Sequence, residues 1–182
     1  MTTTYAALLR GINVSGHKRV PMGDLRELLT RQGHGDVRTY LQSGNAVFTS
    51  ASDDERALTT ALERAIEQRF GFRVECVVRG AGYLRAVAEA CPFPATSLEA
   101  KQLHVTYFSE PVDPGRLSSL DQAVYMPEEF RLGDRALYLY APNGLGRSKL
   151  AGALARPALF QGVTATTRNW NTVVKLVELT HG

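Results

Sequence analysis

Residues 37–49 have the sequence VRTYLQSGNAVFT, in which two apolar segments flank a short polar turn. The first segment carries Val37, Tyr40 and Leu41, and the second is Ala46-Val47-Phe48-Thr49. Since serine, glycine and asparagine between two such segments are typical of a tight turn, the stretch predicts a β-hairpin. The order of elements around this hairpin decides the expected fold.

A strand and a helix are expected on each side of the hairpin. The apolar run Tyr5–Leu9 is typical of a buried strand. After the hairpin, Ser52 and Glu55 have the spacing of a capping box and predict the start of a helix. The elements expected in this part of the chain are a strand (5–9), a helix from Met22 that ends at Gly33, the hairpin, a helix (52–70), a strand (72–78) and a short helix (82–91).

The same order is predicted a second time. Pro92-Phe93-Pro94 interrupts regular structure and is typical of a linker. Asp113-Pro114 predicts a helix start, because proline is favoured at the first helical position. A second hairpin is expected at residues 130–140, FRLGDRALYLY. The elements expected here are a strand (102–108), a helix (113–123), the hairpin, a helix broken at Pro157 (145–159), a strand (163–167) and a final helix (169–179).

Two successive βαββαβ units predict an α+β fold of two tandem ferredoxin-like halves, each with an extra helix. We place the N-terminal half at residues 1–93 and the C-terminal half at residues 94–182. Each half is small enough to be marginally stable alone, so we expect the two to pack as one compact unit. The alternative is a single α+β domain in which the repetition is coincidental.

Length and composition exclude several classes of protein. The chain has 182 residues, 44% of them hydrophobic and 21% charged, which is typical of a globular protein and not of a disordered one. No apolar segment approaches the ~18–20 residues that span a bilayer, and Met1–Tyr5 does not resemble a secretory signal. We therefore expect a cytoplasmic protein with no membrane partner. Cys76 and Cys91 are too few for a disulfide framework or a structural zinc site, so we predict reduced thiols and no metal.

The net charge of +3 conceals an uneven distribution along the chain. No acidic residue precedes Asp24, and none occurs between Arg135 and Val177. These two segments hold nine of the 21 lysines and arginines, which leaves 12 basic against 18 acidic residues in the rest of the chain. We expect a positive face or cleft if the segments meet in space. The alternative is that several of these arginines pair with distant carboxylates.

Four clusters at the ends of predicted elements carry the candidate ligand-binding residues. The first, residues 10–18 (RGINVSGHK), contains glycines that would let the backbone approach a ligand, and Arg10 offers a fork of donors. The second is residues 40–45 (YLQSGN). The alternative for the first cluster is ordinary loop geometry, and for the second it is a plain hairpin turn with Gly44 at positive φ. The third, residues 142–150 (PNGLGRSKL), enters a helix whose N-terminal N–H groups favour an anion, although serine before lysine excludes a P-loop. The candidate anion ligands are Arg10, Asn13, Ser43, Asn45, Ser148, Lys149, Arg168, Asn169 and Asn171.

The fourth cluster surrounds the single tryptophan, Trp170. Asn169 is a candidate N-cap for the last helix, and Arg168 and Asn171 offer donors from the same turn. An exposed Trp170 could stack on a base or ring, whereas a buried one would anchor the last helix. The sequence leaves both open.

The clusters combine guanidinium, amide and hydroxyl groups without paired carboxylates, and no HExxH or GxSxG motif occurs. We therefore predict binding of a phosphate-bearing ligand, either a nucleotide or nucleic acid. Alternatively, the protein is an enzyme for a small anionic or phosphorylated metabolite, with Ser43, Ser148 or His17 in catalysis. In a third hypothesis the motifs are structural and lock the two halves together. The sequence indicates neither a cofactor nor an oligomeric state.

Taken together, the motifs resemble the signatures of a bacterial family, the domain-of-unknown-function 1697 family. They are LLRGINV at 8–14, YLQSGN at 40–45, SKL at 148–150 and RNWNTV at 168–173. The resemblance implies a pair of ferredoxin-like halves, but no established activity, substrate or catalytic residue. Ser15 stands where the family usually has glycine.

Overall fold

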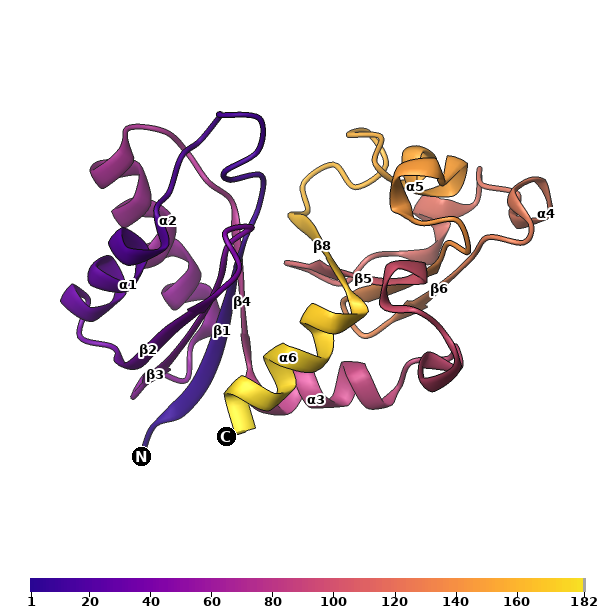
Figure 1. The fold of residues 1–182 in the computed structure, drawn as a ribbon. Helices are drawn as coiled ribbons and strands as arrows, with labels where there is room; N and C mark the ends of the chain where they lie inside the picture. The colour runs from indigo at the N-terminus through magenta and orange to yellow at the C-terminus, as the bar shows by residue number, and fades with distance from the viewer. Residues whose placement is uncertain (182) are drawn as a thin grey trace. The chain divides into compact units, whose positions relative to one another are not determined.

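A computed structural model describes residues 1–181, which divide into two units of mixed α and β structure. The first unit consists of residues 1–85 together with the chain from Leu176 onward, and the second of residues 86–175. Each unit contains one four-stranded antiparallel sheet with helices beside it (Figure 1).

The sheet of the first unit has the strand order β2-β3-β1-β4. The β2–β3 pair is the hairpin predicted at residues 37–49, and β1 lies between β3 and β4 in antiparallel pairings. Two crossovers through helices connect the strands that are not neighbours. The elements are β1 (Thr3–Leu9), α1 (Met22–Arg31), β2 (Gly35–Tyr40), β3 (Asn45–Ser50), α2 (Glu55–Phe70) and β4 (Cys76–Gly80).

Helices α1 and α2 cover one face of this sheet (Figure 1). Alternation along β1 directs Tyr5, Ala7 and Leu9 into the core on that side. The leucines of α1, which recur at helical spacing in the sequence, form the apolar stripe that faces these side chains of β1. Full burial of one such side chain contributes roughly 1.5–3 kcal/mol. The other large members of this core include Leu25, Leu29, Phe48, Leu62 and Ile66.

Helix α2 does not begin with the predicted capping box. Its N-cap is Asp54, whose carboxylate accepts a hydrogen bond from the Ala57 N–H at 3.0 Å. The Ser52 hydroxyl accepts instead from the Asp54 N–H at 3.2 Å. The prediction is wrong because Glu55 is the first helical residue, and its carboxylate accepts from the N–H of Gly80 at 2.7 Å.

Strand β4 begins at Cys76, later than the alternation from Phe72 predicts. The N–H of Cys76 donates to the Glu63 carboxylate of α2 at 2.9 Å. Residues 72–75 therefore form a connection that runs from the end of α2 to the strand. Its side chains border the site described below.

The last part of helix α6 (Trp170–His181) belongs to the first unit. The Arg38 guanidinium of β2 donates to the carbonyl oxygen of Leu179 at 2.7 Å. Arg38 is paired with Val47, on the face of the sheet opposite the core residue Phe48. A cation is favourable at a helix C-terminus, so this contact fixes the end of α6.

The sheet of the second unit has the order β6-β7-β5-β8, which repeats the connectivity of the first. The β6–β7 pair is the predicted second hairpin. Helix α3 (Ala81–Glu89) begins in the first unit and ends in the second. The other elements are η1 (Ala95–Ser97), η2 (Ala100–Gln102), β5 (Leu103–Phe108), η3 (Pro114–Leu117), α4 (Gln122–Tyr125), β6 (Glu129–Gly133), β7 (Ala136–Tyr140), η4 (Leu145–Arg147), α5 (Lys149–Leu154) and β8 (Ala165–Asn169).

Both crossovers of the second unit are less helical than predicted. The helix expected over 113–123 is divided into η3 and α4. The stretch 145–159, expected to contain a helix broken at Pro157, contains η4 and the short helix α5, which ends at Leu154, before the proline. Asp113 caps η3 through the N–H of Gly115, and Asp121 caps α4 through the N–H of Ala123. The prediction is wrong because such short polar side chains bond to nearby backbone groups and divide a helix into separate turns.

Two histidines are withdrawn from solvent to different extents: His34 is half-buried and His104 is buried. Burial lowers the pKa of His34 and of His104 below the ordinary value of 6.5. The unfolded chain therefore binds more protons than the folded one just below this value, so the free energy of unfolding should fall between about pH 7 and about pH 5. Urea unfolding across this range tests the expectation, and His104→Gln should flatten the decline. A decline of unchanged steepness in the variant would contradict the assignment to His104.

Candidate anion-binding site

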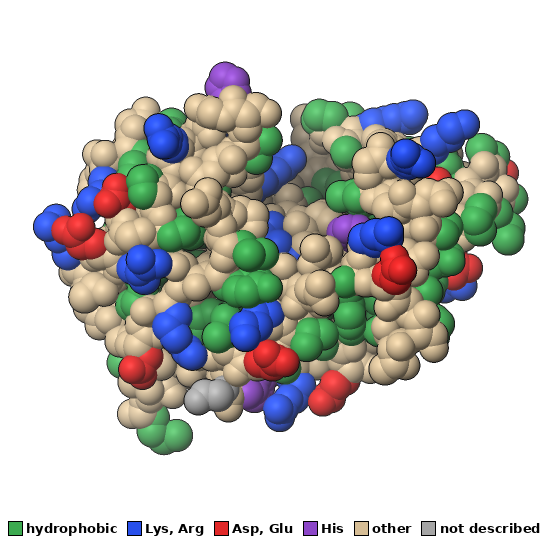
Figure 2. Space-filling model, viewed as in Figure 1, with side chains coloured by type: hydrophobic (Ala, Val, Ile, Leu, Met, Phe, Trp, Pro, Cys, Tyr) green, Lys and Arg blue, Asp and Glu red, His purple; other side chains and the backbone are tan. Residues whose placement is uncertain are grey.

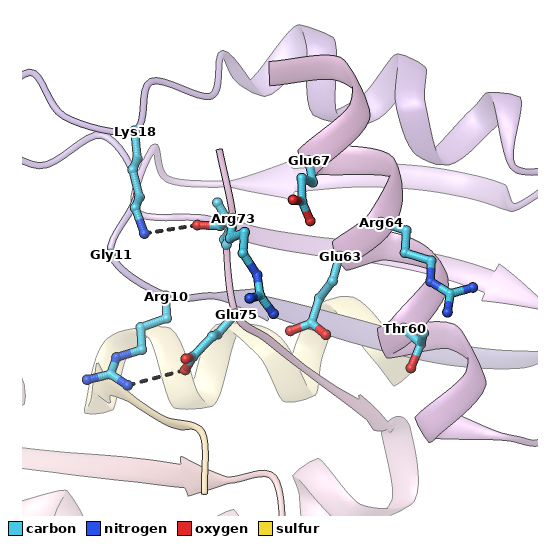
Figure 3. A pocket seen from close by; sticks show the side chains of 10 residues that line it. Arg10, Gly11, Lys18, Thr60, Glu63, Arg64, Glu67, Arg73 and Glu75 are labelled. Carbon is cyan, nitrogen blue, oxygen red and sulfur yellow. Dashed lines mark hydrogen bonds and ion pairs between the residues drawn. The ribbon is translucent and has the colours of Figure 1, made fainter. Parts of the chain in front are cut away.

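A hollow of about 640 Å³ opens in the first unit, where β1 ends and β4 begins (Figure 3). Its walls come from the loop after β1, from helix α2 and from residues 73–75. The volume lies within the ~300–1,000 Å³ typical of ligand pockets. The lining residues are Arg10, Gly11, Lys18, Thr60, Glu63, Arg64, Glu67, Arg73, Val74 and Glu75.

Asn13 holds the loop after β1 in shape. Its Nδ2 donates to the carbonyl oxygens of Val20 at 2.9 Å and Gln42 at 2.7 Å, and its Oδ1 accepts from the Val20 N–H at 2.8 Å. These bonds close the loop on itself and fix it to the turn of the first hairpin. Ser15 has a φ of +53° although it lacks the conformational freedom of glycine.

Arg10 and Lys18, at the two ends of this loop, both contact residues 73–75 (Figure 3). The Arg10 guanidinium lies 3.4 Å from the Glu75 carboxylate, with both side chains more than half exposed. The Lys18 ammonium donates to the carbonyl oxygen of Arg73 at 2.9 Å. An exposed ion pair contributes only about 0–1 kcal/mol, so Arg10 can exchange Glu75 for a stronger anionic partner at little cost.

Arg73 extends into the hollow between the loop and α2 (Figure 3). Within residues 1–181 its guanidinium forms no ion pair with a carboxylate. On the facing helix, Thr60, Glu63, Arg64 and Glu67 have the spacing of one helical face. The hollow thus holds four basic and three acidic side chains.

The hairpin turn uses its asparagine for structure. Asn45 is fully buried, and its Nδ2 donates to the Tyr40 carbonyl oxygen at 2.7 Å and to the Ser43 hydroxyl at 3.4 Å. Gly44 has a φ of +99°, and its carbonyl oxygen accepts from the Leu9 N–H at 2.9 Å. The alternative of a plain hairpin turn therefore describes Gly44 and Asn45 well, while Ser43 is exposed.

In the second unit, Ser148 is the N-cap of α5. Its hydroxyl oxygen accepts from the Ala151 N–H at 2.9 Å, and the hydroxyl donates to the Glu128 carboxylate. Lys149 is exposed beside it. The catalytic role considered for Ser148 would therefore involve Glu128, a residue that sequence reasoning missed.

The residues around the tryptophan differ in their surroundings. Arg168 is only 8% exposed, and its guanidinium donates to the Thr166 hydroxyl at 2.6 Å and to the Thr167 carbonyl oxygen at 3.0 Å. Burial lowers the pKa of Arg168 to about 10, which leaves it charged at neutral pH. The predicted N-cap is confirmed, because the Asn169 side chain accepts from the Thr172 N–H at 3.1 Å. Trp170 is half-buried, and Asn171 is exposed.

Of the nine candidate ligands, Arg10 alone lines the hollow. Asn13, Ser43 and Asn45 lie in the first unit, in the loop and turn that Asn13 joins, and the remaining five lie in the second unit. That all nine residues are anion ligands stays a prediction. Sequence reasoning missed Glu63, Glu67 and Arg73. The polar helical face that begins at Thr60 was the signal for the two glutamates, and the alternation of polar and apolar residues around Val74 was the signal for Arg73.

The surface charge is mixed on the face shown in Figure 2, where basic side chains are spread out and several lie beside acidic ones. Within the two acid-free segments, Arg10 pairs with Glu75 and Arg135 with Asp134. The alternative of pairing with distant carboxylates therefore holds for Arg10, whereas Asp134 directly precedes Arg135 in the sequence. Among residues 1–181, no group of three or more His, Cys, Asp or Glu side chains is placed to hold a metal ion. No helix in this described part of the chain has the length and hydropathy to cross a bilayer.

Comparison with known proteins identifies the family. The family model for proteins of unknown function DUF1697 matches residues 1–138. The chain belongs to the DUF1697 family. The resemblance expected from the motifs is thereby confirmed. The DUF1697 match contains the loop, the first hairpin and every residue that lines the hollow, whereas the candidates Ser148, Lys149 and Arg168–Asn171 follow it in the chain.

One solved structure supports the fold of this DUF1697 protein. The conserved bacterial protein SP0830 from Streptococcus pneumoniae matches with a TM-score of 0.77 at 24% sequence identity, covering 99% of both chains. An unknown protein from Galdieria sulphuraria is 14% identical over 93% of this chain and 99% of that one, and its TM-score of 0.28 supports no structural conclusion. No curated protein matches this chain.

Proposed function

We propose that this protein binds a phosphate-bearing ligand in the hollow of the first unit. The observation that carries the proposal is the convergence of Arg10, Lys18 and Arg73 on one hollow of about 640 Å³. Arg10 and Lys18 come from the loop whose composition predicted an anion site, and Arg73 joins them from the connection before β4. Guanidinium groups bind phosphate through paired, charge-assisted hydrogen bonds, which supports this ligand class.

The hydrogen bonds of several other candidates favour a structural role for them. Asn13, Asn45 and Arg168 donate to protein groups. Asn13 and Asn45 shape the loop and the turn beside the hollow, and so support the site without being needed as ligands. For Arg168, the structural hypothesis predicts a sharp fall in melting temperature for Arg168→Ala.

We also propose that both units are ferredoxin-like and arose by duplication, with the halves at residues 1–93 and 94–182. The matching strand orders, β2-β3-β1-β4 and β6-β7-β5-β8, support this assignment. Cys76 and Cys91 are free thiols, which fits the reducing cytoplasm in which we expect the protein to act.

Calorimetric titration with nucleoside monophosphates and sugar phosphates tests the proposed function. Arg73→Ala should weaken binding of a phosphate compound about ten- to a hundredfold, because a hydrogen bond to a charged group contributes about 1.5–3 kcal/mol. Added salt should weaken binding further, since exposed charges are screened.

Arg31→Ala is the matched control. Arg31 is, like Arg73, an exposed arginine, but it pairs with Glu27 on α1 and does not line the hollow. Its removal should leave binding unchanged. Equal affinity in wild type and Arg73→Ala, or binding of no phosphate compound, would reject the proposal.

A further inference from the structure

The hollow has two walls of different charge. Arg10, Lys18 and Arg73 form the wall from the loop and the connection before β4, and Glu75 is the one acidic residue there. The opposite wall is the face of α2, from which Glu63 and Glu67 extend toward Arg73, whereas Arg64 extends away from it (Figure 3). Basic groups thus face carboxylates across one space.

The Glu63 and Glu67 carboxylates of α2 differ in the contacts that they already make within the protein. One Glu63 oxygen accepts from the Cys76 N–H at 2.9 Å, which leaves its other oxygen as an acceptor. Glu67 is exposed, and within residues 1–181 it forms no ion pair with a basic side chain. Acceptor capacity therefore remains on the α2 wall.

An ionised carboxylate only accepts hydrogen bonds, and it repels a phosphate. A ligand that extends from the basic wall to the α2 wall therefore needs N–H donors at the end away from its phosphate. We infer that the ligand is a small phosphate ester that also carries an amino group, with the phosphate at Arg10, Lys18 and Arg73 and the amino group at Glu63 and Glu67. This inference rests on the proposed function and narrows its ligand class.

Two kinds of molecule share this chemistry. A guanine nucleotide presents adjacent N–H donors on its base, and an amino sugar phosphate presents an ammonium group. A carboxylate binds either one through charge-assisted hydrogen bonds. The volume of about 640 Å³ suits molecules of this size.

Two matched pairs of probes test the inference by calorimetry on the full chain. GMP and IMP differ by the exocyclic amino group, and glucosamine 6-phosphate and glucose 6-phosphate differ by an amino group in place of a hydroxyl. In at least one pair the compound with the amino group should bind about tenfold more tightly than the other. The pair that shows this preference identifies whether the ligand is a guanine nucleotide or an amino sugar phosphate. Glu67→Gln should abolish this preference while phosphate binding persists. Glu89→Gln, which removes an exposed glutamate of α3 outside the hollow, should retain it.

The outcomes distinguish failure of the inferred amino-group recognition from failure of the proposed phosphate binding. If phosphate compounds bind without preference for the amino member in either pair, the inference is wrong and the proposed function stands. A preference that persists unchanged in Glu67→Gln also overturns the inference. If none of the four compounds binds but another phosphate compound does, the inference is wrong; if no phosphate compound binds, the proposed function fails. Melting curves of both variants establish that they are folded.

Discussion

Asn13→Ala should lower the free energy of unfolding by about 3 kcal/mol. The substitution removes three hydrogen bonds of 2.7–2.9 Å, each of which contributes about 0.5–1.5 kcal/mol. Asn13 also has a φ of +55°, a left-handed conformation that alanine adopts less readily than asparagine. Urea unfolding measures the loss, and calorimetry on the same variant should show weaker phosphate binding because Arg10 and Lys18 are no longer held in place.

Asn143→Ala provides the control, since Asn143 is an exposed loop asparagine of the second unit. Its replacement should change the free energy of unfolding by less than about 0.5 kcal/mol. An equally small change in Asn13→Ala would show that the loop is not held by the Asn13 side chain.

Gly44→Ala should destabilise the protein by a similar amount, about 3 kcal/mol, for a different reason. A Cβ at this position would lie 2.8 Å from Cδ1 of Ile12 and 2.9 Å from Cβ of Leu9. Both neighbours are fully buried, so neither can move aside easily. Overpacking of this kind costs about 1–3 kcal/mol, and the left-handed φ of +99° adds a further 1–2 kcal/mol.

Gly16→Ala separates these two contributions. Gly16 also has a left-handed φ, +77°, but among residues 1–181 no atom beyond its two chain neighbours lies within 4 Å of the position that a Cβ would take there. Its replacement should therefore cost only the backbone strain, about 1–2 kcal/mol. Equal melting temperatures for the two variants would contradict the role of the contacts with Ile12 and Leu9.

The hairpins and most strands could be predicted from sequence because their signals are local. Residues 37–49 and 130–140 combine alternating apolar side chains with a turn, and both form the expected pairs. Helix boundaries depend on more distant groups. The Glu55 carboxylate bonds to the N–H of Gly80, and no local pattern in the sequence shows this contact.

The candidate site was predictable only in part. The composition of the loop at residues 10–18 indicated an anion site, and Arg10 and Lys18 do line the hollow. Arg73 and Glu67 were missed because only the packing of α2 beside residues 73–75 brings them to the same place. Asn13 and Asn45 offer amide donors in the sequence, but the folded chain uses those donors within its own loops.

A crystal structure of the protein with bound GMP tests the anion site most directly. The account predicts phosphate oxygens about 3 Å from the guanidinium of Arg10 or Arg73, with the guanine amino group across the hollow beside Glu67. A phosphate bound instead beside Lys149 at the start of α5, with the hollow holding no ligand, would contradict it.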